Sequence, residues 1–137
     1  RANTLGARLV VVHGETIVEP VEPGTNVSAL ASPHVDILAH PGLLTQDDAS
    51  LAVRQGVYLE VSARRGHSLT NGHVVKRGYQ TGASLILDSD AHGPEDLLTA
   101  ELARQIGKGA GLDGEELDAL LETSPKKLLE KLGFSLT

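Results

Sequence analysis

Residues 35–42 are Val-Asp-Ile-Leu-Ala-His-Pro-Gly, an apolar run that ends at a histidine followed by a proline and a glycine. A short run that is rich in aliphatic residues and bounded by Pro or Gly is typical of a strand buried in a parallel sheet. Runs of the same kind occupy residues 9–12, 57–61 and 84–87. The sequence therefore predicts four parallel strands, with the second at 35–39.

Helices are predicted between these strands and after the last one. Thr45 and Asp48 have the spacing of a capping box, which predicts a helix that starts there and ends near Gly56. Asp113 and Glu116 have the spacing of a second capping box, which predicts another helix. The other expected helices are a short one after Thr25, one over 69–80 that closes at Gly82, one over 94–108 and one over 124–133. Alternating strands and helices indicate an α/β fold built from βα units.

The number of strands limits the architecture. A complete βα barrel typically needs about 200 residues or more, whereas this chain has 137. The chain therefore forms either a small open sheet or the C-terminal part of a TIM-like barrel. It begins with Arg1 and contains no Met, which favours the second interpretation. We expect residues 1–137 to form a single domain that is incomplete at its N-terminus.

The composition limits the kinds of metal site and partner that this chain can have. The chain contains no Cys, so a metal ion would be held by His, Asp and Glu, and the lack of disulfides fits a cytoplasmic location. A net charge of −6 argues against nucleic-acid binding, which normally needs a basic patch. No run approaches the roughly 18 apolar residues of a membrane-spanning helix, so no membrane partner is expected.

Polar side chains gather where the predicted strands end, at the edge where α/β proteins place their sites. Imidazoles and carboxylates suit Zn, Mn or Fe, and carboxylates can bridge two ions about 3.5–4 Å apart. The metal-ligand candidates are His13, His40, Asp90 and His92, with Glu15 as a further candidate that could instead orient His13. Two more acidic residues share this edge: Glu60, as a ligand or a support for loop backbone, and Asp88, as a supporting or helix-capping group.

The loop over residues 62–68, Ser-Ala-Arg-Arg-Gly-His-Ser, follows the third predicted strand and leads into a helix. Guanidinium groups and the amides at a helix N-terminus both bind phosphate. We therefore expect Arg64 and His67 to bind a phosphorylated substrate. The alternative is a solvated basic turn. The adjacent Asn71-Gly72 pair is interpreted as a turn that shapes this loop.

With these residues placed, the chain resembles the C-terminal portion of the PHP (polymerase and histidinol phosphatase) family. Two of the matching motifs, Ala-His-Pro and Ser-Asp-Ala-His, are specific when they occur together. The matching segments are Val-Val-Val-His-Gly-Glu at 10–15, Val-Asp-Ile-Leu-Ala-His-Pro-Gly at 35–42, Tyr-Leu-Glu-Val at 58–61 and Asp-Ser-Asp-Ala-His at 88–92.

The resemblance implies an irregular seven-stranded βα barrel that binds up to three divalent metal ions. It implies that His13 and His40 ligate one metal, Asp90 a second and His92 a third. The family also has an early His-x-His, two further histidines and a bridging Glu upstream of the strand that carries His13, and none of these is present in this chain. The resemblance therefore implies about half of a metal site, and activity that needs the missing ligands.

The expected function is that of a metal-dependent phosphoric ester hydrolase. It would resemble a histidinol phosphatase and cleave a small phosphate monoester by attack of a metal-bound hydroxide on phosphorus. One alternative is an amidohydrolase-like enzyme that cleaves C–N bonds. Another is a degenerate, non-catalytic domain or fragment that acts through a partner. An open edge of a parallel sheet also makes a homo-oligomer, or pairing with a missing N-terminal part, plausible.

Overall fold

The computed structural model describes residues 2–135 of the chain. Within this range four strands form one parallel sheet in the order β1-β2-β3-β4. The strands are β1 (Val11–His13), β2 (Ile37–Ala39), β3 (Tyr58–Ser62) and β4 (Leu85–Asp88). The α/β class and the four parallel strands are thereby confirmed, and each strand starts one or two residues later than predicted.

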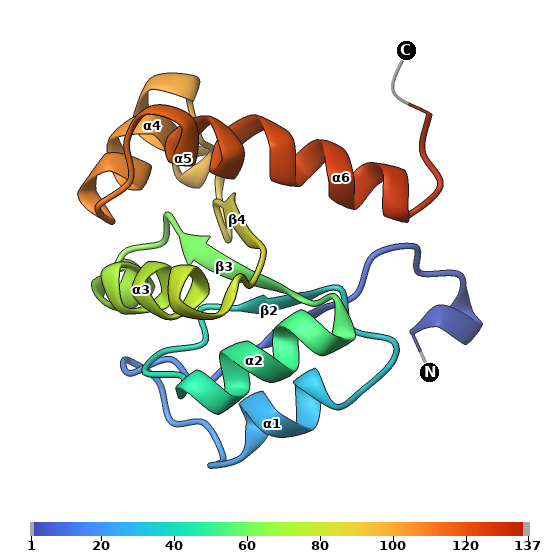
Figure 1. Cartoon of the computed structure of the whole chain (residues 1–137). Coiled ribbons are helices and arrows are strands. Elements are labelled where there is room, and N and C mark those ends of the chain that lie inside the picture. The colour runs from blue at the N-terminus through green and yellow to red at the C-terminus, as the bar shows by residue number, and fades with distance from the viewer. Residues whose placement is uncertain (1, 136–137) are drawn as a thin grey trace.

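The helices cover both faces of the sheet. The helices α1 (Thr25–Leu30), α2 (Gln46–Gln55) and α3 (Asn71–Thr81) connect successive strands and lie together on one face (Figure 1). The C-terminal helices α4 (Ala100–Gly109), α5 (Gly114–Asp118) and α6 (Ser124–Lys131) lie on the opposite side (Figure 1). Shorter helical turns are η1 (Asn3–Leu5), η2 (His67–Thr70), η3 (Pro94–Asp96) and the π-helical η4 (Ala119–Thr123).

Alternate residues of the strands face two separate hydrophobic clusters. Leu38 and Leu59 belong to the larger one, which includes buried residues of α1, α2 and α3. Ile37 and Tyr58, one position earlier on the same strands, face the other side and pack with Leu128 of α6. Because neighbouring side chains of a strand point to opposite faces, burial on both faces explains why these strands are apolar throughout. The rigid sheet then fixes the positions of the residues at its carboxyl edge.

Two of the predicted helices are interrupted in the structure. Residues 67–70 form η2, so α3 begins only at Asn71, although it ends before Gly82 as predicted. The predicted helix over 94–108 is likewise wrong in its first half, because Leu97 is extended between η3 and α4. The hydroxyl of Thr99 accepts the N–H of Leu102 and caps α4, which explains the later start of this helix.

The two capping boxes predicted from sequence have different outcomes. At α2, the N–H of Asp48 donates to the Thr45 hydroxyl and the N–H of Thr45 donates to the Asp48 carboxylate, as predicted. At α5, Asp113 is the N-cap residue, but its side chain makes no capping hydrogen bond. No helix between residues 2 and 135 combines the length and apolar character needed to cross a membrane.

Candidate metal centre

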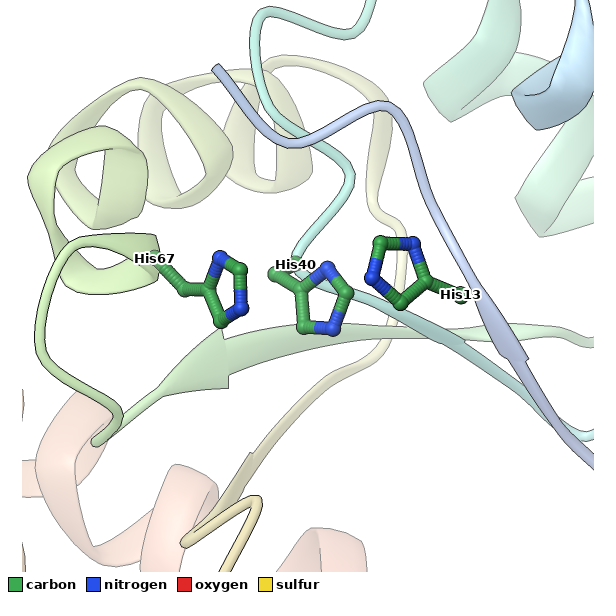
Figure 2. A group of neighbouring side chains, drawn as sticks. All are labelled: His13, His40 and His67. Atoms are coloured by element: carbon green, nitrogen blue, oxygen red, sulfur yellow. The ribbon is translucent and has the colours of Figure 1, made fainter. Parts of the chain in front are cut away.

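Three histidine side chains from distant parts of the chain meet at the carboxyl edge of the sheet (Figure 2). Each offers one ring nitrogen, and these nitrogens lie within 4.8 Å of one another. His40 is in the middle, with its ring centroid 4.2 Å from that of His13 and 4.0 Å from that of His67. We call His13, His40 and His67 the histidine cluster. It joins two predicted metal ligands to a residue that the sequence assigned to substrate binding.

The strands place His13 and His40. His13 is the last residue of β1 and pairs with Ala39, the last residue of β2. Gly14 allows the two segments to continue in close contact, because a Cβ there would lie only 2.5 Å from the carbonyl oxygen of Ala39. The N–H of Gly14 donates to this same oxygen. The two backbones therefore approach so closely that position 14 has no room for a side chain.

The backbone of His40 adopts an uncommon conformation that a buried carboxyl group supports. Its φ of 29° lies in the left-handed region, which non-glycine residues seldom adopt outside functional or over-determined sites. The N–H of His40 donates to the carboxyl group of Glu60, which is 1% exposed. Burial, and then hydrogen bonding to Asp88 and repulsion from it, raise the pKa of Glu60 far above its ordinary value. Of the two roles considered for Glu60, this contact matches support of the backbone.

Two hydrogen-bonding side chains place His67. The side-chain amide of Asn71 donates to the carbonyl of Ser62 (2.8 Å) and accepts the N–H of Ser62 (2.9 Å), which ties together the two ends of the loop. The hydroxyl of Thr16 lies 2.7 Å from Nδ1 of His67, and both residues are buried. The predicted turn at Asn71-Gly72 is therefore wrong, since Asn71 begins α3 and acts as a clamp. No sequence pattern marks Thr16 as a site residue, because its partner lies 51 residues away.

The electrostatics of the two buried rings of the cluster, His40 and His67, favour neutral imidazoles. Burial, followed by repulsion from His67 and His13, lowers the pKa of His40 to about 4. Burial also lowers the pKa of His67, against the opposing effect of nearby carboxylates. These two rings are therefore neutral at pH 7, which is the protonation state that binds metal ions.

Asp90 borders the histidine cluster. Its Oδ2 lies 3.7 Å from Nε2 of His67 and 3.9 Å from Nε2 of His40. Its backbone is also left-handed, with a φ of 47°, and its N–H donates to Oδ1 of Asp88 (3.1 Å). The two non-glycine residues with positive φ in the described range, His40 and Asp90, thus both lie at this site.

The structure places His92 and Glu15 away from the cluster. The side chain of His92 is 63% exposed, and its Nδ1 lies 2.8 Å from Nη1 of Arg64. The carboxylate of Glu15 accepts the backbone N–H of Asn26 at the start of α1. Among residues 2–135, neither belongs to the group of side chains that could share one ion with the histidine cluster.

The two arginines of the loop differ in their surroundings. Arg64 is half-buried, and its guanidinium group contacts the carbonyl oxygen of Asp90 and the carboxylates of Asp90 and Asp96. Arg65 is exposed and makes no ion pair with any residue from 2 to 135. A depression of about 710 Å³ is lined by both arginines and by His92, Glu95 and Asp96. Of the two arginines, Arg65 is therefore the better placed to bind an anion.

Glu19 also reaches the histidine cluster, although the sequence did not single it out. It lies in the connection between β1 and α1, just before Pro20. One carboxylate oxygen is 3.0 Å from Nε2 of His13 and the other is 3.7 Å from Nε2 of His67. No strand-end position marks this residue, because a loop conformation determines where its side chain points.

The donor set fits a divalent metal ion. Ligand atoms bound at about 2.0–2.2 Å in a tetrahedron lie roughly 3.3–3.6 Å apart. The nitrogen–oxygen separations around the cluster, from 3.0 Å at His13 to 3.9 Å at His40, span that range. The buried Nδ1 of His40 also has no hydrogen-bond partner among the described residues, although buried polar atoms are normally paired. Two neutral buried rings, a third imidazole and two nearby carboxylates match the ligands that Zn and Mn accept.

Comparison with known proteins gives relatives that are longer than this chain. No family model matches it. It is 45% identical over 132 residues to an uncharacterized protein of Methanocaldococcus jannaschii, an alignment that covers 96% of this chain and 61% of the relative. It is 28% identical over 117 residues to probable phosphatases of Thermoanaerobacter sp. strain X514 and Thermoanaerobacter pseudethanolicus, covering 77% of this chain and 46% of each relative. The chain thus spans less than two thirds of the length of these relatives.

Proposed function

We propose that this protein is a hydrolase of small phosphate monoesters that depends on a divalent metal ion. The observation that carries the proposal is the histidine cluster, in which three imidazoles from separate segments bring ring nitrogens within 4.8 Å. His40 and His67 are buried and neutral at pH 7, so their ring nitrogens offer lone pairs to a shared cation, which best explains their convergence. The distant similarity to probable phosphatases favours a phosphate ester as the substrate.

The proposed division of labour follows from the contacts of each residue. His13, His40 and His67 would hold the ion, with Asp90 beside them. An ion in this position would supply a Lewis acid that activates water near neutral pH and neutralises phosphoryl charge. Arg65 would bind phosphate oxygens from the depression next to the site. Arg64, already bonded to Asp90 and paired with Asp96, would hold Asp90 in position.

We also propose that the sheet is an arc of a PHP-type βα barrel. The strands are adjacent in chain order, and the three connecting helices lie on one face (Figure 1). A doubly wound open sheet would instead place its connecting helices on both faces and reverse its strand order. In the proposed PHP-type barrel, further strands would pair with the open edge of β1, where Val11 is 48% exposed. Asp90 and His92 would then help to bind additional ions, up to three in the complete site.

The function is tested by hydrolysis of an aryl phosphate and of a cyclic amide by protein stripped of metal and then reloaded with Zn²⁺ or Mn²⁺. Metal-dependent cleavage of the phosphate alone is expected, with complete loss in His40→Ala and Asp90→Ala. His34→Ala is the control, since His34 is exposed in a connecting loop away from the cluster. Cleavage that survives chelation, or that persists in His40→Ala, would contradict the proposal.

A further inference from the structure

The loop between β1 and α1 carries a carboxylate that closes the solvent side of the histidine cluster. The two oxygens of Glu19 contact different members of the cluster, one at 3.0 Å from His13 and the other at 3.7 Å from His67. The side chain of Glu19 is 49% exposed, whereas those of His40 and His67 are 3% exposed. Glu19 therefore lies between the buried rings and solvent.

The ring of His13 faces more acceptors than a neutral imidazole can satisfy. Its Nδ1 lies 3.0 Å from the carbonyl oxygen of Gly14, and its Nε2 lies 3.0 Å from the carboxylate of Glu19. Both partners can only accept, yet a neutral imidazole carries a single N–H. A cation shared by Nε2 and the carboxylate resolves this conflict, because Nδ1 then donates to Gly14 while Nε2 offers its lone pair. Metal-bound histidines commonly donate their second nitrogen to a backbone carbonyl in this way.

The charge of a divalent ion in the histidine cluster also favours a carboxylate ligand. Three neutral imidazoles contribute no charge, so a divalent ion held by them alone would keep both of its positive charges in a partly buried site. Burying uncompensated charge is costly. The carboxylate of Glu19 is closer to the cluster than that of Asp90, whose nearest ring nitrogen is 3.7 Å away and which also pairs with Arg64. Glu19 is thus the better placed carboxylate to neutralise the ion.

We infer that Glu19 is a fourth, exchangeable ligand of the metal ion, which it releases when the phosphate group of the substrate binds. This inference rests on the proposed function, since it assumes an ion in the histidine cluster. Exchange is expected because Glu19 lies in a loop and its side chain is half-exposed, whereas the histidines His13 and His40 are positioned by the sheet. The phosphate and the carboxylate are both anionic oxygen ligands, so they compete for the same position on the ion.

Competition makes two opposite effects diagnostic. Glu19→Gln removes the charge but keeps the size of the side chain, so the Zn²⁺ affinity should fall by at least about tenfold. The same variant, once loaded, should bind inorganic phosphate more tightly, because no internal carboxylate has to be displaced. If Glu19 had a purely structural role, its substitution would weaken both Zn²⁺ binding and phosphate binding. Glu22→Gln is the matched control, because Glu22 lies in the same loop and is exposed.

The experiment measures Zn²⁺ affinity against a competing chelator, the absorption spectrum of Co²⁺-loaded protein, and the affinity of the loaded protein for inorganic phosphate. Glu19→Gln should weaken Zn²⁺ binding, change the Co²⁺ spectrum and strengthen phosphate binding, while Glu22→Gln matches wild type in all three. Wild-type binding and spectra in Glu19→Gln would overturn the inference and leave the proposed function standing. Absence of Zn²⁺ and Co²⁺ binding by wild-type protein would overturn the proposed function as well.

Discussion

The hydroxyl group of Thr16 lies 2.7 Å from Nδ1 of His67, although the two residues are 51 positions apart in the chain. Both are buried, so this contact fixes the orientation of the imidazole. When Nδ1 donates its proton to the hydroxyl oxygen, Nε2 keeps a free lone pair that faces Asp90 and Glu19. Thr16 therefore orients the His67 ring so that Nε2 faces the centre of the cluster.

Thr16→Val removes this hydroxyl group while nearly preserving the volume of the side chain. The variant should bind Zn²⁺ about ten- to a hundredfold more weakly, which is the usual effect of losing a partner that orients a ligand. Thr16→Ser keeps the hydroxyl and should bind like wild type. Calorimetric titration provides both affinities. Equal binding by Thr16→Val and Thr16→Ser would show that the hydroxyl has no role in metal binding.

Gly14→Ala tests the close approach of the two segments that carry His13 and His40. The added Cβ would lie 2.5 Å from the carbonyl oxygen of Ala39 and 2.8 Å from Cα of Pro41, both on the backbone. We expect a loss of about 1–3 kcal/mol in the free energy of unfolding, measured with urea, together with weaker metal binding. Gly109→Ala in α4 is the control, because its Cβ would have nothing within 4 Å. A neutral effect of Gly14→Ala would refute the tight packing described for this position.

Asn71→Ala tests the clamp on the loop that carries His67. The substitution leaves the buried N–H and carbonyl of Ser62 without their side-chain partner. Leaving buried polar groups unpaired costs about 1–3 kcal/mol each, so losing the partner of both groups should lower the free energy of unfolding by about 2–6 kcal/mol. Gln80→Ala, at an exposed position of the same helix, should change it by less than about 0.5 kcal/mol. Similar stabilities of the two variants would argue against the clamp.

The sequence predicted the part of the site that the strands determine. His13 and His40 follow apolar runs, and parallel strands bring their carboxyl ends to one edge of the sheet regardless of loop details. Asp90 follows β4 by the same logic, and its carboxylate borders the cluster. The α/β fold was predictable for the same reason, because runs buried on both faces have a recognisable composition.

The residues that depend on loop conformation were not predictable in the same way. The sequence predicts that His67 binds phosphate together with Arg64, because it follows two arginines in the loop. In the structure its neighbours depend instead on the Asn71 clamp and on Thr16. Glu19 lies between a strand and a helix, where no periodic pattern fixes the direction of a side chain. His92 is two residues from Asp90, but the left-handed backbone at Asp90 ends the extended geometry that would place both on one side.

The metal-free protein should lose stability in acid because of His40. Its pKa is lowered to about 4 in the folded state, mainly by burial, whereas the unfolded chain titrates near 6.5. The unfolded state therefore binds more protons between these values, and the stabilisation present above pH 6.5 is lost as the pH falls toward 4. The contribution of this residue should be about 2 kcal/mol between pH 7 and pH 4.5.

Urea unfolding in the presence of a chelator, at pH values from 7.5 to 4.5, measures this dependence. His40→Gln cannot gain a proton, so its stability should change less with pH than that of wild type. Other groups, including Glu60 with its raised pKa, titrate in both proteins, and the difference between the two curves isolates His40. Parallel curves would show that His40 has an ordinary pKa in the folded protein.

The most direct test of a metal centre at the histidine cluster is equilibrium binding of Zn²⁺ and Mn²⁺. Binding is measured for the chelator-treated protein and for its single histidine variants. The wild-type protein should bind at least one ion, and His13→Ala, His40→Ala and His67→Ala should each weaken binding by about a hundredfold or more, since each removes one ligand. His34→Ala, in an exposed loop, should bind like wild type. Wild-type affinity in His40→Ala and His67→Ala, or no binding by the unaltered protein, would contradict a metal centre at the histidine cluster.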